Sequence, residues 1–230
     1  MLDIFFLSNV IEADRRRYCG WQETEKERWK KLCVEIPVLK EVDISGINSP
    51  NAILMQARGG KILGEINGEA QIYPASMTKI MTVILGIENF DDLDEKITLT
   101  DEMFTGLYEQ DATQAGFQPG EEVRVIDLLY GAMLPSGAEC CIALADTISG
   151  SEADFAELMN KKARKLGMEN THFCDSTGLH NPDHYSTVKD IAVLMKYCIK
   201  NDTFREIVET SRHSTGVTNI HPDGITYYST

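Results

Sequence analysis

Apolar residues recur with two different periods along the chain, and the period changes near residue 70. Two short apolar runs, 52–57 and 61–66, flank Arg58-Gly59-Gly60. This pattern predicts a β-hairpin, because glycine accepts the positive φ of a tight turn. After the turn at Tyr73-Pro74-Ala75, apolar residues follow the i, i+3, i+4, i+7, i+8 spacing of one helical face, namely Met77, Ile80, Met81, Ile84 and Leu85.

The later segments predict mostly helices. Residues 91–124 have the pattern of short strands and loops, with 97–100 as the clearest strand. Proline and glycine positions, together with Ser151 and Thr187 as N-caps, then delimit the helices. They are predicted at 125–134, 138–148, 151–166, 187–199 and 202–209. Strands come first and helices fill the middle, so we predict an α+β fold rather than alternating βαβ units.

The first 40 residues differ from the rest. Residues 23–31 are almost all charged and could form a solvated helix, with Glu27 and Lys31 paired. The apolar run at 1–7 is short, contains Asp3 and precedes the basic cluster at 15–17, the reverse of a secretory signal. We therefore predict an N-terminal arm over 1–40 and one domain over 41–230, with no intact signal peptide and no membrane-spanning helix.

Composition limits the function. The 230 residues are 43% apolar and 25% charged, which is typical of a globular protein. The 22 Lys and Arg against 36 Asp and Glu give a net charge of −14, which argues against binding to nucleic acid. None of the six cysteines forms a Cys-x-x-Cys pair, and Cys140 and Cys141 are expected to be buried small hydrophobes.

The strongest candidate chemistry lies in Pro74-Ala75-Ser76-Met77-Thr78-Lys79. Helical i,i+3 spacing places Ser76 and Lys79 on one face. A serine hydroxyl is a weak nucleophile until a neighbouring base takes its proton, and a neutral lysine can do so. The helix N-terminus and the flanking apolar residues both disfavour an ammonium. The same helix N-terminus offers a backbone N–H to an oxyanion.

Histidines give a weaker signal. His180 and His184 are four residues apart, a spacing that would suit zinc on a helix. Pro182 lies between them and no third ligand is evident, so a loop that structures the domain is the favoured interpretation. We find no glycine-rich phosphate loop and expect no cofactor or metal.

Taken together, the motifs resemble one family. The segment from Tyr73 through Lys79 to Thr82 is similar to the active-site motif of the serine D-alanyl-D-alanine carboxypeptidases. These are low-molecular-mass penicillin-binding proteins (peptidase S11-like). Ser136-Gly137-Ala138 stands where that family has Ser-Gly-Asn. The resemblance covers roughly residues 42–230, including 149–160, 166–173 and 178–187.

The resemblance implies a fold and a reaction. The fold would be β-lactamase/transpeptidase-like: an antiparallel sheet packed with helices, plus a helical subdomain. Ser76 would attack the terminal D-Ala-D-Ala peptide bond of a peptidoglycan stem peptide and form an acyl-enzyme, and β-lactams would acylate it as inhibitors. Lys79 would act as base, Ser136 would relay the proton to the leaving D-alanine, and Gly137 and Ala138 would contact substrate. An extracytoplasmic or cell-envelope location is implied, without cofactor, metal or nucleic acid.

Two departures from the family leave alternatives open. Ala138 replaces the asparagine whose amide binds substrate and lysine in that family. The third family motif, Lys-Thr-Gly, does not occur, and Ser214-Thr215-Gly216 lacks its cation. We therefore expect the C-terminal strands to be missing, and a truncated or degenerate relative that binds muropeptide or a partner is the alternative. A β-lactamase ranks below both, because no Glu-x-x-x-Asn context supplies a deacylating carboxylate.

Overall fold

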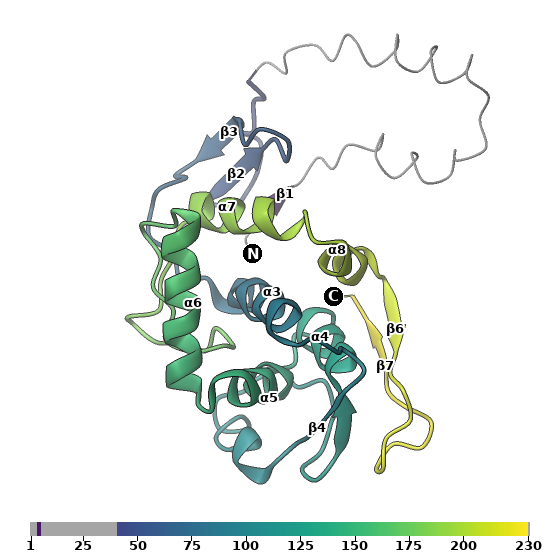
Figure 1. Cartoon of the computed structure of the whole chain (residues 1–230). Coiled ribbons are helices and arrows are strands. Elements are labelled where there is room, and N and C mark those ends of the chain that lie inside the picture. The colour runs from purple at the N-terminus through teal and green to yellow at the C-terminus, as the bar shows by residue number, and fades with distance from the viewer. Residues whose placement is uncertain (1–3, 6–40, 230) are drawn as a thin grey trace, which may run out of the picture. The chain divides into compact units, whose positions relative to one another are not determined.

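The computed structural model describes residues 4, 5 and 41–229, and it divides into two compact units, residues 1–68 and 69–230 (Figure 1). The two units are described separately here. The predicted charged helix at 23–31 lies outside the described residues. The predicted division at 40/41 between an arm and a domain stays a prediction.

The first unit is built on the predicted hairpin. Strands β2 (Ala52–Met55) and β3 (Ile62–Ile66) pair antiparallel, and β1 (Ile4–Phe5) pairs parallel with β2. Gly59 and Gly60 in the connecting turn have φ of 92° and 76°, as the hairpin prediction requires. The hairpin prediction is therefore confirmed.

The second unit is mainly helical and carries two small sheets. The strands β4 and β5 pair antiparallel, as do β6 and β7. Two short 3₁₀ helices, η1 and η2, precede α3 and follow β4, respectively. In chain order the elements are η1 (Ala75–Thr78), α3 (Lys79–Asn89), β4 (Lys96–Thr98), η2 (Asp101–Phe104), β5 (Glu122–Arg124), α4 (Val125–Met133), α5 (Ala138–Ser149), α6 (Glu152–Leu166), α7 (Val188–Cys198), α8 (Asp202–Glu209), β6 (Arg212–Ser214) and β7 (Thr226–Tyr228).

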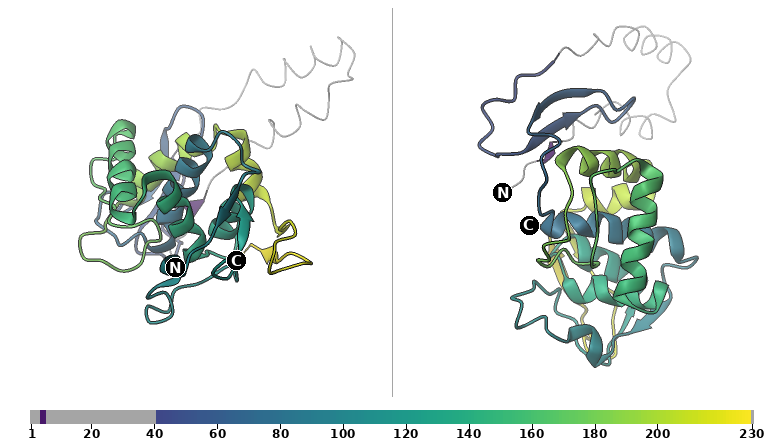
Figure 2. Two further views of the ribbon diagram at one scale, coloured as in Figure 1. Left: turned by 60° about the horizontal axis from the view of Figure 1, so that its bottom comes forward. Right: turned by 90° about the vertical axis from the view of Figure 1, so that its left-hand side faces the viewer.

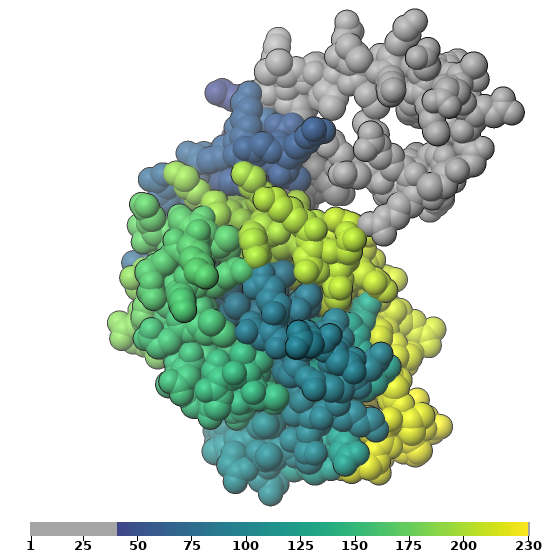
Figure 3. All heavy atoms as spheres, in the orientation of Figure 1, coloured from purple at the N-terminus to yellow at the C-terminus, as the bar shows by residue number. Residues whose placement is uncertain are grey.

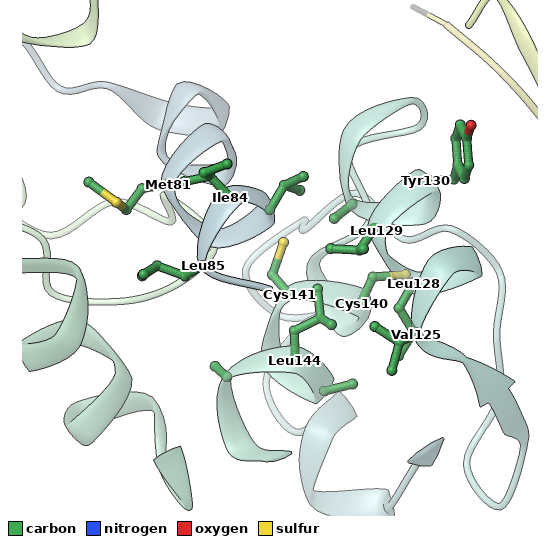
Figure 4. Packing of buried hydrophobic residues seen from close by; sticks show 14 of the residues in the cluster. Met81, Ile84, Leu85, Val125, Leu128, Leu129, Tyr130, Cys140, Cys141 and Leu144 are labelled. Atoms are coloured by element: carbon green, nitrogen blue, oxygen red, sulfur yellow. The ribbon is translucent and has the colours of Figure 1, made fainter. Parts of the chain in front are cut away.

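Helix α3 is the central element of this unit. It contacts α4, α5, α6, α7 and α8, which surround it in the views of Figures 1 and 2. Its apolar stripe therefore meets partners on several sides: Met81, Ile84 and Leu85 are buried and pack in one cluster with residues of α4 and α5 (Figure 4). Cys140 and Cys141 are fully buried in the same cluster, as predicted. A well-packed α3 gives its first residues a fixed position.

Capping residues mark the starts and ends of helices where the sequence predicts them. The hydroxyls of Ser151 and Thr187 accept hydrogen bonds from the N–H groups of Asp154 and Asp190 at the starts of α6 and α7. Gly167 closes α6 in the left-handed conformation. The strand predicted at 97–100 is found at 96–98 instead: Leu99 still bonds to residues 120 and 121, where the predicted Pro119-Gly120 turn interrupts the ladder.

The β6–β7 segment, residues 212–228, is called the C-terminal hairpin below. It forms the yellow margin of the second unit in Figure 3. His213 Nε2 lies 2.8 Å from Asp127 Oδ1 of α4, and His221 Nδ1 lies 2.7 Å from Glu121 Oε1. Two buried carboxylates thus fasten the hairpin, Asp127 to α4 and Glu121 to the loop before β5. None of the helices in the described part of the chain is long and apolar enough to cross a membrane.

Candidate active site

Ser76 and Lys79 lie where a 3₁₀ turn passes into a helix. Ser76 belongs to η1 and Lys79 is the first residue of α3, so the predicted helix start is 3₁₀ in its first turn. The predicted i,i+3 relation holds, and Lys79 Nζ lies 3.4 Å from Ser76 Oγ. This separation is longer than an ordinary hydrogen bond, as is common before substrate binds.

Ser136 completes the predicted group from the loop between α4 and α5. Its hydroxyl donates to Ser76 Oγ at 2.9 Å. The loop is held by the N–H of Gly137, which donates to the Gly131 carbonyl, and by the N–H of Ala138, which donates to the Thr113 carbonyl. The structure thus brings the three predicted catalytic residues together. Gly137 and Ala138 follow directly, and they stay predicted substrate-binding residues.

Two residues of the site have left-handed backbone conformations. Ala75, just before Ser76, has φ of 49°, and Ser136 has φ of 63°. Such conformations cost a residue other than glycine on the order of 1–3 kcal/mol and concentrate at functional sites. The surrounding structure therefore holds Ala75 and Ser136 in conformations that neither segment would favour alone.

Lys79 is buried, with 5% of its surface exposed. Its closest polar partner is the backbone carbonyl of Thr177, which accepts from Nζ at 2.7 Å. The ion pairs found among the described residues do not include Lys79. Carbonyl and hydroxyl partners leave Nζ able to take a proton from Ser76, whereas a carboxylate would commit it to an ion pair.

The segment 175–178, called the active-site turn below, lies along the start of α3. The Ser176 carbonyl accepts from Thr82 Oγ1 at 2.6 Å, so the turn is tied to α3 at a second point besides Lys79. A Cβ on Gly178, whose φ is 82°, would lie 1.9 Å from the Ala75 carbonyl oxygen. Only glycine fits a contact this close, so the turn touches the backbone beside Ser76.

Asp175 organises the active-site turn. Its Oδ1 accepts from the Thr177 N–H at 2.8 Å, the Thr177 hydroxyl at 2.7 Å and the Gly178 N–H at 2.7 Å. Its Oδ2 lies 3.2 Å from His184 Nδ1. Burial raises the pKa of Asp175, but hydrogen bonds from His184 and Thr177 and the charge of His184 outweigh burial and lower it to about 2.

His184 links the hydrogen bonds of Asp175 to η1. It is 2% exposed, and its Nε2 lies 2.9 Å from the hydroxyl oxygen of buried Thr78. The ring of His180 instead meets Tyr73 edge-on at 5.0 Å. Residues 41–229 contain no group of three or more His, Cys, Asp or Glu side chains placed to hold a metal ion. His184 structures its loop, in keeping with the favoured interpretation of the histidine spacing.

Glu139 supports the other side of the site. It is fully buried, and its Oε1 accepts from the N–H groups of Ala115 at 2.6 Å and Gly116 at 2.9 Å. These bonds fix the segment whose Thr113 carbonyl receives the Ala138 N–H. Burial raises the pKa of Glu139, and the backbone hydrogen bonds oppose that rise.

Sequence reasoning missed Asp175, Thr177, His184 and Glu139 as parts of the site. Thr177 acts through a backbone carbonyl, which no side-chain motif reveals. A partial signal existed for Asp175, because Asp-Ser-Thr-Gly has the pattern of a tight turn immediately before a segment that resembles the family.

The chain matches one family of known proteins. The family model described as D-alanyl-D-alanine carboxypeptidase (peptidase S11) matches residues 39–227. The chain belongs to this family. Among curated relatives, D-alanyl-D-alanine carboxypeptidase DacF of Bacillus subtilis is 39% identical over 162 residues, covering 70% of this chain and 41% of the relative. DacC of Escherichia coli is 35% identical over 209 residues, covering 80% and 51%.

Solved structures of the family agree. A point mutant of the Streptomyces K15 DD-transpeptidase superposes with a TM-score of 0.76 at 30% identity, covering 80% of this chain and 74% of that one. Penicillin binding protein 5 of Haemophilus influenzae gives 0.70 at 28% identity, covering 79% and 54%. The predicted α+β, β-lactamase/transpeptidase-like fold is confirmed. The chain spans about half the length of the two curated relatives.

Proposed function

We propose that this chain carries the acylation centre of a serine D-alanyl-D-alanine carboxypeptidase and that β-lactams acylate the same serine. The observation that carries the proposal is the contact set of Ser76 Oγ, which lies 2.9 Å from Ser136 Oγ and 3.4 Å from Lys79 Nζ. Family membership supports it, because the matched residues 39–227 contain all three side chains.

The proposed reaction begins with proton transfer from Ser76 to the neutral amine of Lys79. Oγ forms a bond to the carbonyl carbon of the penultimate D-alanine, and the backbone N–H of Ser76 at the start of η1 donates to the oxyanion. The C–N bond then breaks, and the proton returns from Lys79 through the Ser136 hydroxyl to the amino group of the leaving D-alanine. Water hydrolyses the ester, which frees the shortened peptide and restores Ser76.

The substrate class follows from the family. A peptidoglycan stem peptide that ends in D-Ala-D-Ala is the proposed substrate, and the proposed place of action is the cell envelope, outside the cytoplasmic membrane. The acidic chain has a net charge of −14, which suits neither nucleic acid nor an anionic membrane surface.

The proposal is tested by D-alanine release. The 230-residue chain is incubated with diacetyl-L-lysyl-D-alanyl-D-alanine, and free D-alanine is measured over time. We expect release from the wild type and none from Ser76→Ala. Release that survives Ser76→Ala would contradict the assignment of the nucleophile.

A second candidate function is binding of muropeptide without turnover. Ala138 favours it, because this position offers a methyl group where the family motif has an asparagine amide. Loss of a hydrogen bond to a charged group costs about 1.5–3 kcal/mol, or roughly tenfold to a hundredfold in rate. The two candidates separate in Ala138→Asn: a carboxypeptidase with a weakened site gains D-alanine release, whereas a binding protein releases none with either residue.

A further inference from the structure

Two chains of hydrogen bonds lead from His184 to Lys79. The first runs from Nε2 to Thr78 Oγ1 at 2.9 Å, and Thr78 is the residue before Lys79. The second runs from Nδ1 to Asp175, which fixes the N–H and hydroxyl of Thr177, whose carbonyl receives Lys79 Nζ at 2.7 Å. His184 and Asp175 therefore hold both the residue beside Lys79 and the acceptor of its side chain.

The acceptor decides where the lysine amine sits. Nζ is 2.7 Å from the Thr177 carbonyl oxygen but 3.4 Å from Ser76 Oγ, so the carbonyl is the closer partner. If the carbonyl moved, Nζ would follow it away from the nucleophile. A displacement of about 1 Å in a reacting group can cost roughly a hundredfold in rate.

The pair is built for rigidity. The His184 ring is buried and meets Phe173 edge-on at 5.6 Å, which restricts its rotation. Asp175 accepts hydrogen bonds only, so its contact with Nδ1 requires a proton on that nitrogen. The backbone N–H of Cys174 lies 3.3 Å from the same nitrogen, and with the proton on Nδ1 this contact is not a hydrogen bond. On the far side of the turn, Glu152 accepts from the N–H and the hydroxyl of Ser176 at 3.0 and 2.7 Å.

We propose that Asp175 and His184 are positioning residues for Lys79, which keep its amine against Ser76 by fixing the Thr177 carbonyl and the Thr78 hydroxyl. This inference rests on the proposed function, in which Lys79 is the base. The two residues contact neither Ser76 nor Ser136, so they act on the site through the residues that they hold, namely Thr78, Thr177 and Gly178.

The chain contains a matched control for this inference. His213 and Asp127 form a second histidine–aspartate pair, with 2.8 Å between Nε2 and Oδ1, and it ties β6 to α4. His213→Gln removes a ring from a pair of the same chemistry without touching the active-site turn. His184→Gln and Asp175→Asn are the test variants, and Thr78→Val is a milder one, because it keeps the shape of the side chain.

The first measurement is acylation of the whole chain by a fluorescent penicillin over a range of concentrations, with thermal unfolding recorded for each variant. We expect His184→Gln and Asp175→Asn to lower the acylation rate at saturating penicillin by about tenfold or more. The half-saturating penicillin concentration should stay nearly constant. Thr78→Val should slow it less. His213→Gln should lower the unfolding temperature and leave the rate unchanged. Equal rates in the test variants and the control would overturn the inference.

The second measurement does not depend on activity. Trace acetylation of Lys79 by acetic anhydride is followed by peptide mass spectrometry as the pH is varied. The charges of Lys79, Glu152, Glu139 and Asp175 all act on the buried thiol of Cys141, and His184 faces Asp175. We expect the labelling profile of Lys79 to change in Asp175→Asn and in Thr78→Val but to stay the same in His213→Gln.

The two measurements separate the two proposals. If the wild type is not acylated, the proposed function fails, and the labelling profile alone decides the positioning role. An unchanged profile in Asp175→Asn and Thr78→Val, with only a lower unfolding temperature, would show that the pair is structural and would overturn the inference.

Discussion

The active-site turn and the C-terminal hairpin are each held by a histidine beside a buried or largely buried carboxylate. At the hairpin, Asp127 of α4 accepts from the Gly216 N–H and from the Arg124 side chain, and His213 also stacks on Tyr130 at 3.7 Å between ring centroids. In the turn, Asp175 and His184 organise the carbonyl that receives Lys79. The same kind of pair therefore ties β6 to α4 in one place and, under our proposal, positions the amine of Lys79 in the other.

The hairpin and the active-site turn differ in the groups to which their carboxylates are hydrogen-bonded. The second hairpin anchor, Glu121, accepts from His221, from the Thr218 hydroxyl at 2.5 Å and from the Gln118 N–H, all groups that only hold structure. The turn shares its bonds with Lys79 and touches the backbone before Ser76. Damage to the hairpin should therefore lower stability alone, whereas damage to the turn should lower stability and acylation together.

Matched glycine substitutions should give the largest effect. Gly178→Ala places a methyl group 1.9 Å from the Ala75 carbonyl oxygen at a φ of 82°. We expect a loss of about 3 kcal/mol in the free energy of unfolding and a fall of roughly a hundredfold in penicillin acylation.

Gly224→Ala is the hairpin counterpart, with a φ of 68° and a Cβ 2.5 Å from the Thr215 carbonyl oxygen. Denaturant unfolding should show a loss of about 2 kcal/mol, while the acylation rate stays at the wild-type value. Similar acylation defects in both variants would show that the hairpin affects acylation as much as the turn does.

Substitution of Ser136 should separate stability from acylation. Ser136→Gly relieves the left-handed conformation and should raise the free energy of unfolding by up to about 1 kcal/mol. It also removes the hydroxyl 2.9 Å from Ser76 Oγ, so acylation should fall roughly tenfold to a hundredfold. Ser136→Ala should lower both quantities, and a more active Ser136→Gly would refute the role of this hydroxyl.

Acid should reveal the ion pair of the active-site turn. The pKa of Asp175 is lowered from 3.8 to about 2 in the folded protein, so its stabilising effect is complete above pH 4 and is lost as the pH falls through about 2. The effect is worth about 2 kcal/mol. Between pH 5 and pH 2, the free energy of unfolding measured in urea should fall more steeply for the wild type than for Asp175→Asn. Parallel curves would show that the Asp175 carboxylate does not stabilise the folded protein.

The smallest effect is expected at the hairpin anchor. His221→Gln removes a ring nitrogen 2.7 Å from Glu121 Oε1, while Thr218 and Gln118 keep their bonds to that carboxylate. Calorimetry should show a loss of about 1 kcal/mol, or roughly 2–4 °C in Tm. A slower acylation in this variant would mean that the hairpin does reach the catalytic centre.

Much of the fold could be predicted because local signals coincide with the structure. Ser151 and Thr187 begin helices and Gly167 ends one, through hydrogen bonds and a backbone conformation that depend only on near neighbours. The pairing of Ser76 with Lys79 was equally local. The strand lies at 96–98 rather than at the predicted 97–100, because its end depends on bonds to residues 120 and 121.

The rest of the site could not be predicted because it depends on contacts between distant residues. Thr177 lies 98 positions after Lys79 and contributes a carbonyl, and His184 lies 106 positions after Thr78. Neither the identity of Thr177 nor the spacing of His180 and His184 indicates that role. Ser136 was predicted through family resemblance, and the structure adds its left-handed backbone and its bond to Ser76.

The most direct test of the acylation centre is the site of covalent modification by a penicillin. The 230-residue chain, Ser76→Ala and Lys79→Ala are treated with benzylpenicillin, and the digests are mapped by mass spectrometry. We expect one penicilloyl group per chain, on Ser76, formed much more slowly in Lys79→Ala and absent from Ser76→Ala. An adduct on another residue, or an unmodified Ser76 in the wild type at saturating penicillin, would contradict it.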